Sequence, residues 1–267
     1  MYMRSSWLTQ YQAALTLTLA SNSEKQGVTE MVNIIKGTEF NDNGIDKPRL
    51  IGTDPVTIEA PPNSLPILIK SGVDEIYGYA GNDVLSGLGG DDVLYGASGQ
   101  DNLFGGEGSD KLYGDTQNDW LYGEAGNDNL YGQAGDDKLY GHTGNDALTG
   151  GSGKDYLSGF GSGQEYDILT GGTEADTFAV GSPTNIVQYL GAGYATITDF
   201  NRGQGDKIQL LDLEDSNNQY SLGTSNWLGS SALDTGVYYK GDLMAIVQDT
   251  TNLSFQTDFT FVPFVAG

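Results

Sequence analysis

Apolar residues recur at a fixed nine-residue interval through the middle of this chain. From Gly78 onward the units read GYAGNDVLS, GLGGDDVLY, GASGQDNLF and so on, with an apolar residue at the eighth place of each. Repetition at a constant period indicates a repeat architecture in which every unit is one small structural element. The apolar residues of the series are Ile76, Val84, Leu85, Leu94, Leu103, Leu112, Leu121, Leu130, Leu139, Leu148 and Leu157.

Each unit divides into a turn and a strand. Places one to six are rich in Gly, Asn and Asp, residues that favour tight turns. We expect the glycines at the first and fourth places to supply positive φ and close backbone approach. Places seven to nine predict a short strand whose middle side chain points inward. Two units then make one circuit, so that residues eighteen apart stack about 4.8 Å from one another, and the predicted fold class is all-β.

Changes in repeat pattern and proline content along the sequence predict four regions. The segment Ile34-Ile35, followed by GTEFND at 37–42, has the form of a degenerate repeat, and five of the seven prolines lie between 45 and 71. No proline interrupts 72–180, as an unbroken backbone ladder requires. The regions are a leader or N-terminal cap (1–36), a degenerate repeat with a proline-rich insertion (37–71), the repeat array (72–180) and a β-rich C-terminal cap (181–267).

The C-terminal region loses the nine-residue period but keeps strand-like alternation. We predict strands in it because a solenoid needs a different structure to cover its last coil and its unpaired edge. The expected strands are 195–200, 207–210, 236–239, 243–247 and 255–262.

Charge excludes one class of partner and favours another. Thirty-six Asp and Glu against twelve Lys and Arg give a net charge of −24, which excludes nucleic acid because a polyphosphate is bound by basic side chains. Cations are the expected partner. The chain has no cysteine and a single histidine, His142, so thiolate and His-rich metal sites are excluded. Residues 15–19 fit a strand or amphipathic leader better than a cleaved signal, and no membrane span is expected.

An aspartate occupies the sixth place of every unit. After Asp155 the phase slips by three residues, and Asp167 and Asp176 then resume the pattern. When the coils stack, these side chains fall on two edges. One edge carries Asp83, Asp101, Asp119, Asp137 and Asp155, and the other carries Asp74, Asp92, Asp110, Asp128 and Asp146.

Stacked carboxylates and turn carbonyls match the ligand preference of calcium. Ca²⁺ takes six to eight oxygen ligands, whereas Mg²⁺ demands a tight octahedron that a stacked array does not offer. We therefore predict Asp74 to Asp155, Asp167 and Asp176 as metal ligands. The expected carbonyl ligands lie near Gly78, Gly81, Gly87, Gly90, Gly96, Gly99, Gly105, Gly108, Gly123, Gly126, Gly132, Gly135, Gly141, Gly144, Gly150 and Gly153.

Four gaps on each edge predict about eight ions, which would bring the formal charge from −24 to −8. Two carboxylates about 5 Å apart repel by roughly 3 kcal/mol at an effective dielectric near 20. Several such pairs exceed the ~5 to 15 kcal/mol by which a domain is stable. We therefore expect the array to fold only when metal binds.

These units resemble the repeats-in-toxin family, or haemolysin-type calcium-binding repeats, whose pattern is G-G-x-G-x-D-x-apolar-x. The resemblance covers about 110 residues, and the segments Ile197 to Phe200 and Gly205 to Ile208 are similar to the I-x-D-F and G-x-D-x-I motifs of secreted members. It implies a right-handed parallel β-roll holding calcium between successive turns. It also implies an extracellular protein exported by a type I secretion apparatus through an uncleaved C-terminal signal. The C-terminal stretch is similar to cyanobacterial representatives.

Three departures predict weaker or empty sites. Gln117, Glu165 and Glu174 replace the fourth-place glycine. The slip around 161–165 is expected to affect the last one or two ions.

Aromatic residues at the ninth place should form two outward columns. Stacking places Tyr77, Tyr95, Tyr113 and Tyr131 in one column and Phe104, Tyr122 and Tyr140 in the other. Such columns stabilise a sheet through cross-strand pairs, and they are also compatible with a glycan or cell-surface partner.

No catalytic motif is present, since the sequence has neither HExxH nor G-x-S-x-G. The expected function is that of a non-enzymatic, secreted calcium-binding protein that folds outside the cell. The alternatives are the C-terminal folding and secretion module of an enzyme or adhesin, and a glycan- or surface-binding structural protein.

Overall fold

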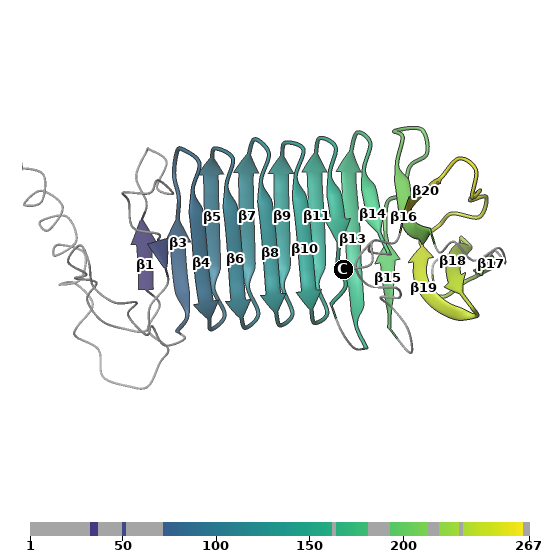
Figure 1. Cartoon of the computed structure of the whole chain (residues 1–267), viewed down its shortest axis with the longest axis horizontal. Helices are drawn as coiled ribbons and strands as arrows, with labels where there is room; N and C mark the ends of the chain where they lie inside the picture. The colour runs from purple at the N-terminus through teal and green to yellow at the C-terminus, as the bar shows by residue number, and fades with distance from the viewer. Residues whose placement is uncertain are drawn as a thin grey trace, which may run out of the picture. The chain divides into compact units, whose positions relative to one another are not determined.

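The computed structural model describes residues 33–36, 50–51, 72–161, 164–180, 193–212, 219–229 and 232–263. All regular secondary structure in these ranges is β-strand, and the strands form two sheets that face each other across a narrow core (Figure 1). No helix long and apolar enough to cross a membrane occurs in the described part of the chain.

From β1 to β16 successive strands alternate between the two sheets, whereas β17, β18 and β19 all belong to the first sheet. The first sheet contains, in chain order, β1 (Asn33–Lys36), β3 (Asp74–Tyr77), β5 (Val93–Ser98), β7 (Lys111–Thr116), β9 (Asn129–Ala134), β11 (Ala147–Ser152), β13 (Tyr166–Thr173), β15 (Tyr194–Ile197), β17 (Tyr220–Ser225), β18 (Asp234–Tyr239) and β19 (Asp242–Val247). The second contains β2 (Leu50–Ile51), β4 (Val84–Gly89), β6 (Asn102–Glu107), β8 (Trp120–Ala125), β10 (Lys138–Thr143), β12 (Tyr156–Ser158), β14 (Thr177–Ala179), β16 (Lys207–Asp212) and β20 (Phe259–Pro263).

The pairing between coils is parallel and has the predicted eighteen-residue register. Leu94 pairs with Leu112 in the first sheet, and Leu103 pairs with Leu121 in the second. Two nine-residue units therefore make one coil, and the fold is a parallel β-roll. The segment at Ile34-Ile35 also follows the roll, because β1 pairs in parallel with β3 and aligns Ile35 with Ile76. The predictions made for 1–32, 37–49 and 52–71 lie outside the described residues.

The strands are twice as long as predicted. β5 and its equivalents contain six residues, running from the seventh place of one unit to the third place of the next. The sequence predicted only three, because the glycine-rich first places have turn chemistry. In the roll the turns of neighbouring coils lie in register, so the backbone of these places joins the ladder as well.

Positive φ occurs at the second and fourth places, not at the first and fourth as predicted. At the second place ordinary residues take the left-handed conformation, for example Ala97 (φ 74°) and Gln133 (φ 76°). At the fourth place Gly99 has φ 148°, and a Cβ there would collide with the carbonyl of Gly81 in the coil before. The first-place glycines are absent from the left-handed region and serve another purpose, described below.

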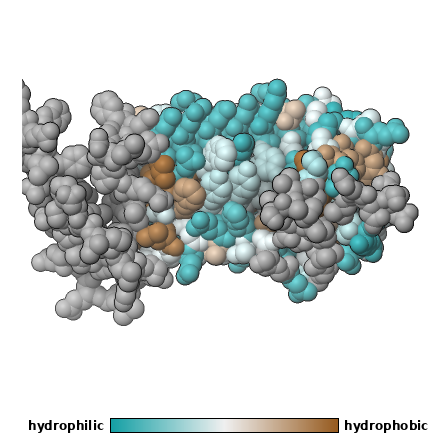
Figure 2. Space-filling view, in the orientation of Figure 1, coloured by the Kyte–Doolittle hydropathy of each residue, from teal (hydrophilic) through white to brown (hydrophobic). Residues whose placement is uncertain are grey.

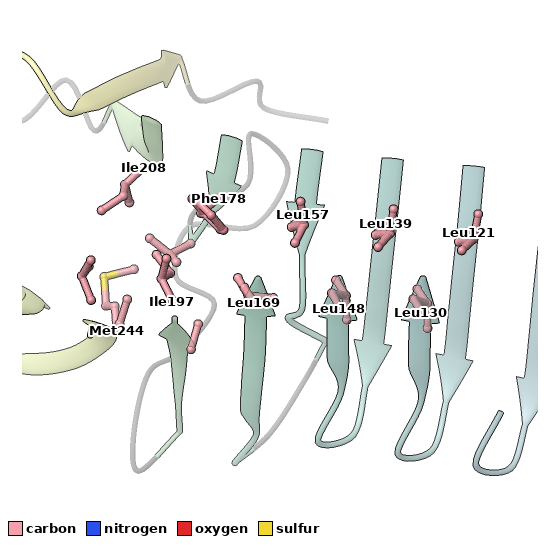
Figure 3. Packing of buried hydrophobic residues seen from close by; sticks show 14 of the residues in the cluster. Leu121, Leu130, Leu139, Leu148, Leu157, Leu169, Phe178, Ile197, Ile208 and Met244 are labelled. Atoms are coloured by element: carbon pink, nitrogen blue, oxygen red, sulfur yellow. The ribbon is translucent and has the colours of Figure 1, made fainter. Parts of the chain in front are cut away.

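The core of the roll is a single file of leucines from each sheet. Every predicted eighth-place residue from Ile76 to Leu157 is at most 1% exposed, and the two files meet between the sheets (Figure 3). Leu169 and Phe178 continue them past the phase slip. Beyond these, Ile197, Ile208 and Met244 join the same cluster (Figure 3).

The three-residue slip does not interrupt the roll. Strand β11 pairs with β13 so that Leu148 aligns with Leu169, twenty-one residues away. The extra residues are therefore accommodated between strands, and the ladder continues through β15 and β16 into the region where the period is lost.

The C-terminal strands differ from the prediction in their bounds and in one additional strand. The strand predicted at 195–200 is Tyr194–Ile197, and those predicted at 207–210 and 236–239 extend over Lys207–Asp212 and Asp234–Tyr239. Strand β17 was not predicted, since its segment YSLGTS is polar and contains glycine; it pairs antiparallel with β18. The predicted strand at 255–262 begins only at Phe259, because residues 254–258 form a turn in which the carboxylate of Asp258 accepts the Ser254 N–H at 2.7 Å.

Both aromatic columns form as predicted. The rings of Tyr77, Tyr95, Tyr113 and Tyr131 stack with centroids 4.8 to 5.0 Å apart and nearly parallel planes. The rings of Phe104, Tyr122 and Tyr140 stack in the same way at 4.9 and 5.1 Å. Because each ring face lies against its neighbour, the columns act as cross-strand pairs.

Candidate metal centre

All twelve predicted aspartates lie in the turns, immediately before or at the start of a strand, and each is at most 2% exposed. Alternate units place them on opposite edges of the roll, as predicted. We define two columns. Column A contains Asp74, Asp92, Asp110, Asp128, Asp146 and Asp167, and column B contains Asp83, Asp101, Asp119, Asp137, Asp155 and Asp176.

In ten of the twelve aspartates, from Asp92 to Asp176, one carboxylate oxygen ties neighbouring coils together. The Oδ1 atom of Asp119 accepts the backbone N–H of Asp101 at 2.8 Å, and Oδ1 of Asp137 accepts the N–H of Asp119 at 2.8 Å. The same bond is repeated along both columns. Each of these side chains therefore points back toward the preceding coil.

The second carboxylate oxygen has no hydrogen-bond donor within the described chain. It is buried, and it lacks a partner in nine aspartates: Asp92, Asp101, Asp110, Asp119, Asp128, Asp137, Asp146, Asp155 and Asp176. A buried polar atom without a partner carries an appreciable desolvation cost, and a buried anion carries a larger one. Something other than the polypeptide is needed to satisfy these atoms.

A first-place glycine carbonyl lies opposite this oxygen. A Cβ built on Gly114 would lie 2.5 Å from Oδ2 of Asp119 and 2.9 Å from the carbonyl oxygen of Gly132 in the next coil. The glycine therefore keeps open a space bounded by one carboxylate oxygen and one carbonyl oxygen, which we call the cradle. Eight cradles of this form occur, at Gly78, Gly87, Gly96, Gly105, Gly114, Gly123, Gly132 and Gly141.

The cradle fits a hard divalent cation. It offers only oxygen atoms, one of them a carboxylate oxygen that has no donor in the cradles from Gly87 to Gly141, as Ca²⁺ prefers. Three or more acidic or histidine side chains do not converge on one point in the described part of the chain. A cation held in a cradle would therefore take a minority of its ligands from these carboxylates and the others from backbone carbonyls or solvent.

The structure separates the predicted carbonyl ligands into two groups. First-place carbonyls such as those of Gly105 and Gly132 line the cradles. Fourth-place carbonyls such as that of Gly81 instead pack against the fourth-place glycine of the next coil. Gly114, which the sequence analysis did not select because its unit contains Gln117, lines a cradle like the others.

The positions that depart from the repeat keep the columns continuous. Gln117 and Glu174 take the left-handed conformation of the glycines they replace, with φ of 76° and 83°. At the slip, the carboxylate of Glu165 accepts the N–H of Gly144 at 3.3 Å and that of Gly161 at 2.7 Å. Oδ1 of Asp167 still accepts the Asp146 N–H at 2.9 Å.

One member of column B was missed in the sequence. Oδ1 of Asp206 accepts the N–H of Asp176 at 3.1 Å, thirty residues away. The motif G-x-D-x-I around Asp206 has the local pattern of a repeat unit, with Ile208 two positions after the aspartate. Only the irregular spacing concealed it.

Burial raises the pKa values of these carboxyl groups. It raises the pKa of Asp110, Asp119 and Asp146 to about 8, and hydrogen bonds from the backbone oppose the shift while neighbouring aspartates add to it. The pKa rises to about 6 at Asp92, Asp128 and Asp137, where burial is again the main cause. Metal-free columns therefore hold protons in a pH range where exposed aspartates are ionised.

A parallel roll with eight oxygen cradles defines a class: this is a calcium-binding β-roll protein. Residues 70–103, 104–139 and 131–159 match the sequence model of the RTX calcium-binding nonapeptide repeat (4 copies). The array is thus built of RTX repeats, in agreement with the resemblance noted in the sequence.

No curated protein matches the chain. Among solved structures, one match is the AlgE6R3 subunit from the Azotobacter vinelandii mannuronan C5-epimerase, in solution. It is 25% identical, with a TM-score of 0.24, and the match covers 55% of this chain and 78% of that one.

Proposed function

We propose that this protein is secreted and that its repeats fold outside the cell on binding about eight calcium ions, one in each cradle. The observation that carries the proposal is the eightfold pairing of a first-place glycine cradle with a buried aspartate oxygen. The net charge of −24 supports it, because eight Ca²⁺ would offset sixteen of those charges.

The predicted ligands keep their roles in this proposal, with one adjustment. The eight cradles belong to Asp83, Asp92, Asp101, Asp110, Asp119, Asp128, Asp137 and Asp146. The gap between Asp74 and Asp92 has no first-place glycine, since Ile69 stands at that position. The gap between Asp146 and Asp167 has one, so the four cradles of column A are shifted by one coil toward the C-terminus, while those of column B lie in the predicted gaps.

Export by a type I secretion apparatus through the C-terminal region fits the same proposal. Repeats whose folding depends on metal stay unfolded where calcium is scarce and fold where calcium is plentiful, so their folding is linked to the compartment. The array itself has a structural role in this proposal and no catalytic one.

The proposal is tested by titrating the metal-free chain with calcium while recording circular dichroism, and by counting bound ions by native mass spectrometry. We expect a cooperative gain of β signal with calcium, none with magnesium at the same concentration, and about eight ions at saturation. A chain that is fully folded in EDTA would overturn the proposal.

A substitution assigns the ions to the columns. Asp119→Ala removes Oδ2 from its own cradle and the Oδ1 bond to Asp101, so we expect one or two fewer ions. Asp115→Ala is the matched control, because Asp115 lies at an outward second place and contributes to no cradle. An unchanged ion count in Asp119→Ala would contradict the assignment.

A surface-binding role is the second candidate. Trp120 is 41% exposed beside Tyr122 in the second column, with the ammonium of Lys138 4.1 Å from its ring centroid. Retention of the calcium-loaded chain on immobilised polysaccharide, abolished in Trp120→Ala and Tyr122→Ala, would support a glycan partner. The same measurement on a longer protein carrying this array would test the alternative that it is the folding module of an enzyme or adhesin.

A further inference from the structure

Four aspartates of residues 193–263, three of them buried and Asp199 half-buried, are satisfied differently from those of the repeats. Asp206 uses both oxygens as acceptors, one for the N–H of Asp176 at 3.1 Å and the other for the N–H of Asn201 at 2.8 Å. Asp199 accepts the N–H groups of Gly171 and Gly172 at 2.9 and 2.8 Å. Neither carboxylate keeps an oxygen without a donor.

Two further aspartates in this region follow the same rule. Asp234, which is fully buried, accepts the N–H of Asp249 at 2.9 Å through Oδ1 and that of Trp227 at 3.0 Å through Oδ2. Asp258, also fully buried, pairs with the guanidinium of Arg202 and accepts the Ser254 N–H at 2.7 Å. N–H donors of the protein thus satisfy both oxygens of these four side chains. In nine aspartates of the repeats, by contrast, Oδ2 has no such donor.

The strand pairing of this region is largely its own. Strands β18 and β19 form an antiparallel hairpin joined at Lys240 and Gly241, and β17 pairs with β18. Strand β15 pairs with β19, and β16 pairs with β20. These contacts need no repeat unit, although β15 and β16 also continue the two sheets of the roll.

The core of this region is also thicker. Each repeat strand from β5 to β11 buries one leucine, whereas β18 and β19 bury several side chains each. The buried apolar residues are Ala195, Ile197, Ile208, Leu210, Leu211, Val237, Tyr239, Met244, Ala245, Ile246, Val247 and Phe259. Strands β18 and β19 thus bury more apolar side chains per strand than the repeat strands do, and burial of apolar surface stabilises a fold without a metal.

From these contacts we infer that residues 193–263 keep their fold without calcium and present a formed end to the metal-dependent repeats. Asp199 and Asp206 then hold the last repeat turn, at Gly171 to Asp176, through backbone N–H donors in place of a cation. The inference rests on the proposed function only in taking the repeats to need metal.

Amide hydrogen exchange followed by mass spectrometry on the full chain tests the inference, in EDTA and at saturating calcium. We expect residues 194–212 and 234–263 to exchange slowly in both conditions, and 84–158 to exchange slowly only with calcium. If both regions exchange fast in EDTA, the inference fails while the proposed function stands. If both exchange slowly in EDTA, the proposed function fails.

Two matched variants assign the effect to the carboxylates. Asp234→Asn turns an amide toward N–H donors, and we expect exchange at 234–247 in EDTA to become at least about tenfold faster, since a hydrogen bond to a charged group contributes ~1.5 to 3 kcal/mol. Asp119→Asn, in the repeats, should leave the exchange of 193–263 in EDTA unchanged. Equal effects of both variants on 234–247, or none from Asp234→Asn, would overturn the inference.

Discussion

Asp119 in the repeats and Asp234 in the C-terminal strands are both fully buried, yet their surroundings differ. Asp234 accepts hydrogen bonds at both oxygens from three backbone N–H groups. Asp119 accepts one N–H at Oδ1, and its Oδ2 faces a glycine and a carbonyl oxygen. A buried aspartate thus has hydrogen-bond donors for both oxygens in the C-terminal strands but for only one oxygen in the repeats. Burial alone does not reveal a metal site, whereas the donors around the buried group do.

The two regions also differ in hydrophobicity, and the face of the roll shown in Figure 2 displays this. In Figure 2 the array is mostly hydrophilic, and the most hydrophobic residues on this face lie toward its two ends. A coil that buries one leucine per strand and exposes polar turns has little hydrophobic stabilisation. We therefore expect metal binding in the cradles to determine whether the repeats fold. For the C-terminal strands we expect the apolar core to do so.

The largest expected effect is a gain of structure in the metal-free repeats on acidification, opposite in sign to the effect of acid on Asp258 of the C-terminal strands. In the repeats the folded pKa values of about 6 to 8 lie above the ordinary value of 3.8. Their contribution to stability is therefore full below 3.8 and is lost as the pH rises through 6 to 8. We expect the metal-free repeats to gain β signal in circular dichroism between pH 8 and pH 5.

Asp258 has the reverse sign. Burial by itself would raise its pKa, but hydrogen bonds from Arg202 and Ser254 outweigh burial and hold the pKa below its ordinary value. Its contribution is present above that value and is lost on acidification. Repeats that lose structure as the pH falls from 8 to 5 in EDTA would contradict the comparison.

Core truncation should separate the regions next. Leu121→Ala removes the only core side chain of β8, and we expect it to lower the free energy of unfolding in saturating calcium by about 2 to 5 kcal/mol. The midpoint of the calcium titration should move to higher concentration. Met244→Ala, a matched loss in β19, should be of similar size without moving that midpoint. Urea unfolding at fixed calcium measures both, and an equal calcium shift in the two variants would argue that the regions fold as one unit.

Filling a single cradle should have a local effect. In Gly114→Ala the new Cβ would lie 2.5 Å from Oδ2 of Asp119 and 2.9 Å from the carbonyl of Gly132, so we expect one ion fewer by native mass spectrometry. Gly203→Ala is the control, because a Cβ there meets nothing closer than 3.1 Å. A full ion count in Gly114→Ala would show that the cation does not lie in the cradle.

The smallest expected effect is that of the aromatic columns. Tyr113→Ala interrupts the stack between Tyr95 and Tyr131, and the loss beyond buried area should be about 0.5 to 1.5 kcal/mol for each aromatic pair. Tyr113→Phe keeps the ring and should be nearly neutral. Thermal unfolding in saturating calcium compares the two, and a large loss in the Phe variant would indicate a role for the hydroxyl.

The sequence by itself determined the parts of this protein that depend on period and residue type. The leucine at each eighth place, the two aspartate columns and the two aromatic columns all follow from a nine-residue period with two units per coil. Such features depend on which residues lie above one another, and an exact repeat fixes that relation without reference to the rest of the fold.

Only the tertiary structure decided the length of the strands, the role of the first-place glycine and the membership of Asp206 in column B. Each depends on contacts between coils whose spacing the sequence does not state. The strands are long because turn backbones of neighbouring coils pair in register, and the first-place glycine matters because a Cβ there would fall between oxygens of two coils. Asp206 joins column B because the chain returns to the same column thirty residues after Asp176. The contrast between Asp119 and Asp234 has the same origin. Donors from distant segments satisfy both oxygens of Asp234, whereas only Oδ1 of Asp119 has a donor.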